Sequence, residues 1–399
     1  MELYEKKYVK ANFLETDHGQ IPCQNCHGGN PDEDDWQTAH EGVTKDPTFP
    51  NPEAVCGECH GEIVASSVTS LHFTLGPMQA AIHKRIGNED APTRKIIDGA
   101  MDRHCFGCHA SCGQCHVSRP DYADGGFLAA HRFVKQPSMD TTCASCHGGR
   151  VYGEYTGAKD DDEADVHYAD EEMTCMDCHQ STEMHASAQH IANRHDLPKQ
   201  PTCQACHPDT AAEDAENRSH SLHRNKVACQ VCHAQTSKSC FICHVGTDKK
   251  GLPYFKCKET RMVFKIGLNT VKSEKRPYDY VVVRHPPVAP QTFDAYVKNG
   301  LKHFDDLPTW KPSFPHNIRR ITRQNRTCNN CHGKAQLFLN KTDLASWEIA
   351  ANAGVIVPDS RVPGTVDPNI GKDGTVQSKN ANDTAALLYR KKGADEGKE

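Results

Sequence analysis

The sequence predicts a chain of mostly irregular coil with short α-helices, wrapped around a row of bound groups and lacking a large apolar core. Three observations lead to this fold class. Hydrophobic residues make up only 37% of the 399 residues, and the mean hydropathy is −0.70. The 28 glycines and 23 prolines favour turns and loops. Cysteine, with 21 residues, and histidine, with 25, are unusually frequent, and a chain this polar needs disulfides, metals or cofactors to replace a core.

The cysteines are arranged in one repeated motif. Twenty of the 21 fall into ten Cys-x-x-Cys pairs, and a histidine follows the second cysteine of every pair. This spacing is the signature of haem c attachment. Two thiols would add to the two vinyl groups of one haem, and the adjacent histidine would bind its iron as the proximal ligand. The attachment cysteines are Cys23, Cys26, Cys56, Cys59, Cys105, Cys108, Cys112, Cys115, Cys143, Cys146, Cys175, Cys178, Cys203, Cys206, Cys229, Cys232, Cys240, Cys243, Cys328 and Cys331. The proximal histidines are His27, His60, His109, His116, His147, His179, His207, His233, His244 and His332.

Other cysteine-rich sites explain this motif less well. Zinc ribbons, iron–sulfur sites and disulfide frameworks all use paired cysteines. None of them requires a histidine after each pair, whereas haem c does. We therefore expect ten haem c groups.

Fifteen histidines lie outside the motifs and are candidates for the second axial position of the irons. The first ten to consider are His40, His72, His83, His131, His167, His185, His195, His223, His285 and His316, and the remaining five are His18, His104, His190, His220 and His303. Several stand shortly before a motif, where the local chain could fold over its own haem or a neighbouring one. Methionine is another common axial ligand, but none of the eight methionines shows a repeated offset from a motif. Fifteen histidines are enough to saturate ten irons, and a saturated iron serves electron transfer.

The spacing of the motifs divides the chain. Residues 1–244 form a nine-haem region, residues 245–327 a haem-free insertion with a β-hairpin, and residues 328–399 carry the tenth haem and a polar tail. Only two residues separate His109 from Cys112, so the third and fourth haems should be neighbours. The patterns predict helices over 61–86, interrupted at Gly76-Pro77, and over 181–196. Alternating apolar residues predict strands over 262–267 and 278–283, a small β-element within 258–285.

Cys257 is the one cysteine outside the motifs. Most unpaired cysteines are buried, inert thiols. The alternatives are an intermolecular bond or a thiolate close to an iron.

The net charge and the expected location limit the classes of partner that the protein could bind. The polypeptide carries −6, and about −1 for each ferric haem with ionised propionates would bring the holoprotein to about −16, which disfavours nucleic acid. Haem c is attached outside the cytoplasm, so we expect a periplasmic, cell-surface or extracellular protein. No secretion signal follows Met1, so the numbering should begin after a cleaved leader. No apolar run reaches membrane-spanning length, so we expect no transmembrane segment.

The motif array in residues 23–332 resembles the multihaem c-type cytochromes of anaerobic respiration, including those that carry electrons to extracellular acceptors. The resemblance implies a chain of stacked haems that transports electrons. It also implies partners among other cytochromes or redox proteins, extracellular acceptors such as metal oxides, or further copies of the chain in a filament joined through end haems.

The same superfamily contains reductases of nitrite, hydroxylamine, sulfite or tetrathionate, which keep one haem five-coordinate. Some of these use lysine as proximal ligand in Cys-x-x-Cys-Lys, a motif that this sequence lacks. We therefore expect an electron carrier with ten bis-histidine haems and no catalytic residue. The alternative is a reductase with an open iron near 245–327, where Arg284 and His285 would face an anionic substrate.

Overall fold

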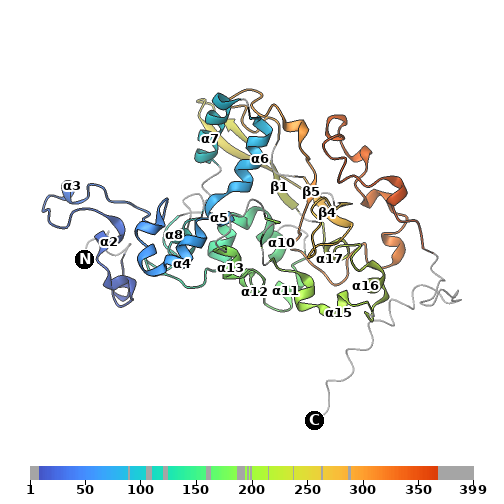
Figure 1. Cartoon of the computed structure of the whole chain (residues 1–399), viewed down its shortest axis with the longest axis horizontal. Coiled ribbons are helices and arrows are strands. Elements are labelled where there is room, and N and C mark those ends of the chain that lie inside the picture. Colours follow the sequence, from blue (N-terminus) through green and yellow to red (C-terminus); the bar gives the residue numbers. More distant parts are fainter. Residues whose placement is uncertain are drawn as a thin grey trace, which may run out of the picture.

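The computed structural model describes residues 9–88, 90–104, 110–119, 125–158, 163–186, 194–195, 197, 200–213, 215–236, 238–261, 264–285 and 289–366. For residues 150, 211, 238–246, 253 and 255–261 it describes the backbone alone. The chain runs along the long axis of the molecule, with α2 (Cys23–His27) near one end and α16 (Arg218–His223) and α17 (Cys229–His233) toward the other (Figure 1).

Most helices have one or two turns, and many coincide with a cysteine motif. The motif helices are α2, α4 (Gly57–Ser67), α8 (Cys112–His116), α9 (Ala144–His147), α12 (Cys175–Cys178), α14 (Cys203–Cys206) and α17, with a 3₁₀ turn at Cys328–Asn330 for the last motif. The others are α3 (Trp36–Ala39), α5 (Leu71–Thr74), α6 (Gly76–Ile86), α7 (Ala91–His104), α10 (Gly153–Thr156), α11 (Val166–Ala169), α13 (Ser181–Met184), α15 (Pro208–Ala211) and α16. Helices this short are not stable alone in water, so contacts outside each helix hold its motif in place.

Side-chain caps set where several of these helices begin. The hydroxyl of Ser111 accepts a hydrogen bond from the backbone N–H of Gln114 at the start of α8. The side chain of Asn217 does the same for Ser219 at the start of α16. Such caps satisfy donors that the first helical turn leaves unpaired.

The prediction of an interrupted helix over 61–86 is confirmed. The chain forms α4, α5 and α6 there, and the interruption falls at Leu75, which has a left-handed backbone (φ 46°). Gly76 and Pro77 begin α6, where a missing backbone N–H costs nothing. Of the helix predicted over 181–196, α13 covers 181–184, and residues 187–193 and 196 lie outside the described part.

Helix α7 was not predicted from the sequence. This helix packs on α6 and forms an apolar cluster with a later loop, whose members are Ile82, Ile86, Ile97, Ala100, Met101, Phe293, Leu301 and Phe304. The cluster anchors one part of the segment 245–327 on the N-terminal half of the chain.

The predicted β-element is confirmed with shifted limits. Strands β3 (Lys265–Leu268), β4 (Tyr280–Arg284) and β5 (Lys311–Pro312) form an antiparallel sheet in that order, with Ile266 opposite Val282. Met262 and Val263 lie outside the described residues. The sheet packs against α17 and against residues 338–357. The buried members of this apolar cluster are Ala228, Val231, Ile266, Val281, Val282, Val283, Trp310, Phe338, Leu339, Leu344, Val355, Ile356 and Val357.

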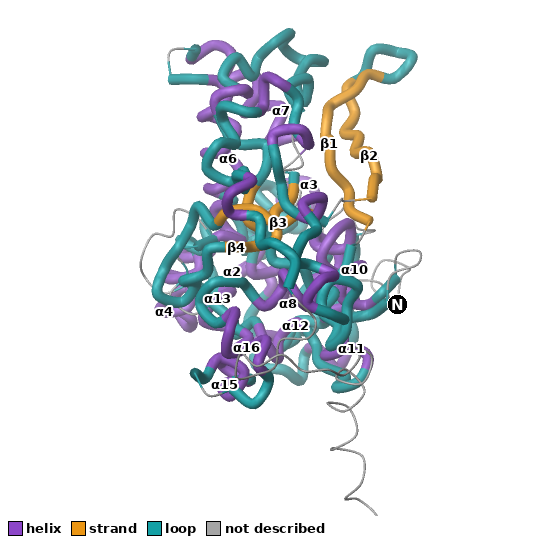
Figure 2. Tube along the Cα trace, turned by 90° about the vertical axis from the view of Figure 1, so that its right-hand side faces the viewer, coloured by secondary structure: helices purple, strands orange, loops and turns teal. Residues whose placement is uncertain are grey.

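A second, two-stranded sheet precedes it. Strands β1 (Lys238–Thr247) and β2 (Pro253–Arg261) form an antiparallel hairpin beside α7 (Figures 1 and 2). The hairpin contains the backbone of the ninth motif and of Cys257. In the part of the chain that the structure describes, each helix is too short or too polar to cross a membrane.

Candidate functional site: a row of paired histidines

Eight motif histidines each face a histidine from outside the motifs. In every pair the ring centroids lie 5.8 to 6.2 Å apart. The pairs, with the motif histidine first, are His27–His131, His60–His18, His116–His185, His147–His72, His179–His316, His207–His167, His233–His220 and His332–His223. The angle between ring planes varies from 18° to 77°, so the constant feature is the separation and not a common mode of ring stacking.

This separation has a chemical meaning. An imidazole nitrogen binds a metal ion at about 2 Å, and the ring centroid lies about 1 Å further out, so two rings on opposite sides of one ion are about 6 Å apart. The observed pairs match this spacing. Among the described residues, no group of three or more His, Cys, Asp or Glu side chains is arranged to hold a bare metal ion. Each pair thus offers two ligands, and the gap between its rings has the width for one metal ion. The other ligands of such an ion would come from a group that is not part of the protein.

Hydrogen bonds at Nδ1 orient many of these rings. Motif histidines donate from Nδ1 to backbone oxygens: His27 to Thr44 at 2.8 Å, His116 to Val134 at 2.7 Å, His233 to Arg319 at 3.0 Å and His332 to Gly364 at 3.1 Å. A proton held on Nδ1 leaves the lone pair on Nε2, the nitrogen that a metal would use. Outer partners of this kind fix both the tautomer and the orientation of a metal ligand.

Two paired histidines bond to carboxylates instead. Nδ1 of His179 lies 2.9 Å from Oε2 of Glu183, and Nδ1 of His167 lies 2.8 Å from Oδ1 of Asp165. The bond to Asp165 raises the pKa of His167, because a carboxylate stabilises positive charge on the ring.

Burial keeps most of the non-motif partners neutral. It lowers the pKa of His72 to about 4, with a further contribution from the nearby His147. Burial is also the main cause of lowered pKa values at His18, His131, His185, His220 and His316. A neutral imidazole is the form that binds metals, so these side chains are ready ligands at neutral pH.

The structure brings together only part of the candidate set. Six of the first ten candidates lie in pairs, namely His72, His131, His167, His185, His223 and His316, and two of the remaining five do, His18 and His220. Only His220 faces the motif that follows it directly. The others reach motifs elsewhere in the sequence, and spacing along the chain carries no signal for such partners.

The other described candidates for the second axial position have contacts with residues of other types. Nε2 of His83 lies 2.6 Å from Asp98, and Nε2 of His104 lies 2.6 Å from the hydroxyl of Tyr296. Nδ1 of His303 lies 2.7 Å from Asp306, Nδ1 of His40 lies 2.7 Å from the oxygen of Trp36, and His195 packs on Phe314. His190 and the third motif (Cys105, Cys108, His109) lie outside the described residues, as do the side chains of Cys240, Cys243, His244 and Cys257.

Comparison with protein-family models, curated proteins and solved structures gives no match for this chain. The geometry of the sites is therefore what bears on function.

The cysteines of successive motifs lie close together in space. Cys56 of the second motif is near Cys26 of the first and Cys112 of the fourth; burial and these two thiols raise its pKa to about 11. Cys115 of the fourth motif is near Cys143 of the fifth, and Cys143 is near Cys175 of the sixth.

The row continues through the second half of the chain. Cys178 of the sixth motif is near Cys203 and Cys206 of the seventh. Cys203 is near Cys229 of the eighth motif, and Cys232 is near Cys331 of the tenth. The described motifs thus follow one another in the spatial order one, two, four, five, six, seven, eight and ten. In Figure 1 the motif helices α2, α8, α12 and α17 follow the long axis in the same order.

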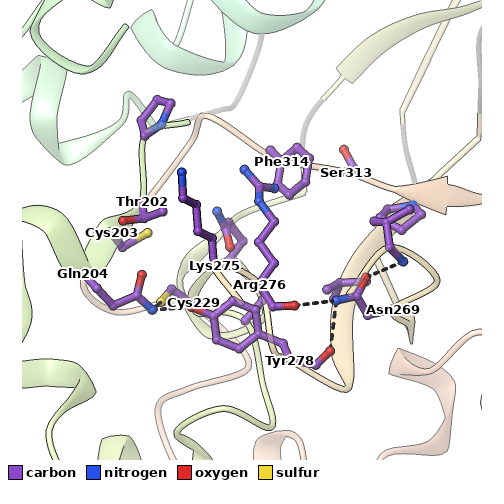
Figure 3. Close-up of a pocket in the computed structure, with 16 residues that line it drawn as sticks. Thr202, Cys203, Gln204, Cys229, Asn269, Lys275, Arg276, Tyr278, Ser313 and Phe314 are labelled. Carbon is purple, nitrogen blue, oxygen red and sulfur yellow. Dashed lines mark hydrogen bonds between the residues drawn. The ribbon is translucent and has the colours of Figure 1, made fainter. Parts of the chain in front are cut away.

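A cavity opens between the seventh and eighth motifs, lined by Cys203 and Cys229 (Figure 3). The guanidinium of Arg276 lies 3.8 Å from the ring centroid of Phe314, and Arg194 lies 5.3 Å from the same ring. Partial burial of Arg276 lowers the pKa of its guanidinium, and among the described residues neither arginine forms an ion pair with a carboxylate. A partly buried cation without a carboxylate partner suits an anionic group in the cavity.

The structure gives Arg284 and His285 other partners than an anionic substrate. Arg284 forms an ion pair with Glu154, and both side chains are buried. Nε2 of His285 lies 3.3 Å from Glu348, and its ring packs edge-on against Trp310 at 4.8 Å. The described contacts of Arg284 and His285 are with other side chains of the protein and hold its interior together.

Proposed function

We propose that this chain is an electron-transfer cytochrome with ten covalently attached haem c groups, and that the eight histidine pairs are the axial ligands of eight of their irons. The proposal combines two independent features of the chain: the ten Cys-x-x-Cys-His motifs in the sequence and the pairs in the fold.

One observation carries the proposal. Each of the eight pairs joins one motif histidine to one histidine from elsewhere, always at 5.8 to 6.2 Å between ring centroids. Chance packing of histidines would also bring motif histidines onto each other or onto other aromatic rings. A haem iron requires this composition and this spacing, because the motif histidine binds from one side and the second histidine from the other.

The residues fit the group. The Nδ1 bonds of motif histidines such as His27 and His116 leave Nε2 free to bind a metal, and the partly buried Arg276 suits an ionised propionate. Haem c supplies one-electron chemistry at its iron. The work of this chain is to hold the ligands, to exclude water and to keep neighbouring sites in contact.

Two histidine ligands leave an iron no position for substrate, so such sites pass electrons without binding reactants. The proximity of cysteines from successive described motifs supports electron passage along the molecule. We therefore propose a conduit that works outside the cytoplasm. Its partners would be redox proteins, metal oxides or further copies of the chain.

Mass spectrometry and electron paramagnetic resonance (EPR) test this proposal. The purified holoprotein should weigh as much as the polypeptide plus ten haems, and its oxidised form should be low-spin at all irons that have two histidine ligands. A chain that carries no covalent haem would overturn it. A large high-spin ferric signal, together with turnover of nitrite, hydroxylamine, sulfite or tetrathionate by the reduced protein, would instead favour the reductase.

A further inference from the structure

Two adjacent sites of the row differ from the other described sites in what bonds to their axial histidines. Among the paired histidines that the structure describes, His179 of the sixth site and His167 of the seventh are those whose Nδ1 bonds to a carboxylate. At the other sites with a described Nδ1 bond, at His27, His116, His223, His233 and His332, the acceptor is a backbone oxygen.

Both carboxylates are sheltered from solvent and held in place. The side chain of Glu183 is 11% exposed and comes from α13, four residues after His179. Asp165 is 2% exposed and accepts three hydrogen bonds, from Nδ1 and the backbone N–H of His167 and from the backbone N–H of Ile318 at 2.7 Å. Ile318 is two residues beyond His316, the partner of His179, so the same loop serves both sites.

A carboxylate acts on a ligand differently from a carbonyl. When a carboxylate accepts the hydrogen bond from Nδ1, it increases the electron density on the ring. Nε2 then becomes a stronger electron-pair donor to the metal. A stronger donor stabilises the ferric form of the iron and lowers its reduction potential, since hydrogen bonds to axial ligands are one means by which a protein sets that potential. Low solvent exposure preserves the effect, because water screens the negative charge less.

We propose that Glu183 and Asp165 are positioning residues that make the sixth and seventh haems the most reducing members of the row. This inference rests on the proposed function, since it takes the histidine pairs as axial ligands. It adds that the midpoint potentials along the row are uneven, with a low-potential step between the fifth and eighth sites.

The test is a redox titration of the holoprotein, followed by haem absorbance, for Glu183→Gln and Asp165→Asn. Both amides keep an oxygen that can accept the Nδ1 proton, so ring orientation is maintained while the negative charge is lost. In each variant we expect one component at the low-potential end of the titration to move to a more positive potential, with all other components in place.

Asp177→Asn is the matched control. Asp177 lies within the sixth motif, and its carboxylate bonds to Thr174 and not to a histidine. The substitution removes the same charge as the two test variants. It should leave the low-potential components unchanged. A low-potential end that stays fixed in both test variants, or that moves equally in the control, would overturn the inference.

Haem count by mass and spin state by EPR are read first on the unaltered protein, so that failure of the cytochrome proposal is recognised separately. Glu183→Asp provides a second arm if Glu183→Gln loads fewer haems. It keeps the charge but lengthens the bond, and it should give a smaller positive shift at the same component. No shift at full haem load would contradict the role of Glu183.

Discussion

His316 faces His179 across a gap of 6.2 Å between ring centroids, and its backbone N–H donates to the buried carboxylate of Glu154 at 3.1 Å. His316 comes from the loop before the tenth motif, whereas His179 belongs to the sixth. The contact therefore joins the segment 245–327 to the middle of the row of histidine pairs.

Substitution His316→Ala should remove one axial ligand from the sixth haem. We expect about one iron in ten to change from low-spin to high-spin, because a single histidine leaves the iron five-coordinate or bound to water. EPR of the oxidised variant, integrated against total iron, measures this. His303→Ala is the control, since His303 bonds to Asp306 on the surface, and it should give the same spectrum as the unaltered protein. A low-spin spectrum from His316→Ala at full haem load would contradict the pairing.

The buried ion pair behind this site should matter for stability. Glu154 is 1% exposed and Arg284 is 6% exposed, and they bond directly to each other. Glu154→Gln leaves the charge of Arg284 buried without its counter-ion, which should lower the free energy of unfolding by about 3–5 kcal/mol. Denaturant titration followed by circular dichroism measures the loss. The double variant Glu154→Gln/Arg284→Met should recover part of it; equal losses in both variants would show that the charge is not the cause.

The apolar cluster behind the three-stranded sheet should behave as an ordinary core. Leu339 is fully buried there, so Leu339→Ala should cost about 2–5 kcal/mol of unfolding free energy through lost burial and the cavity left behind. Leu252→Ala is the matched control, because Leu252 is 62% exposed. It should change stability by less than about 0.5 kcal/mol. A small effect at Leu339 would mean that ligation, and not this core, holds the sheet.

Thiol chemistry tests the covalent part of the proposal. If twenty cysteines form thioethers, Cys257 is the one thiol left in the chain. Alkylation of the reduced, denatured holoprotein should add a single label, and peptide mapping should place it at Cys257. Cys257→Ser should abolish labelling. Two or more labels on the unaltered protein would show that a motif lacks its haem.

The sequence predicts the local motifs of this protein better than their three-dimensional arrangement. Ten motifs name twenty cysteines and ten histidines directly, because attachment requires fixed local spacing. The strands near Ile266 and Val282 were also predictable, since alternation of apolar residues is a local signal. Their exact limits were not, because these depend on what packs against the sheet.

The histidine partners were predictable only as a set. His72 and His131 look no different in sequence from His83 and His40, yet the first two face motif histidines and the others bond to Asp98 and to the oxygen of Trp36. The choice is made by tertiary contacts between distant segments, which a single sequence does not reveal. Helix α7 was missed for a similar reason, since its buried face is completed by Phe293 and Phe304 from a later loop.

The interleaving of these pairs has a consequence for how the chain holds its shape. As axial ligands, His316 and His223 would be tied through an iron to motifs far away in the sequence, so each such bond would close a large loop in the polypeptide. Closing a loop restricts the unfolded chain and so favours the folded one, in the way that disulfides do. Because the loops overlap, release of one segment would require several metal bonds to break together. We therefore expect the holoprotein to unfold as one unit and to resist proteases, although its helices are short and its apolar clusters small.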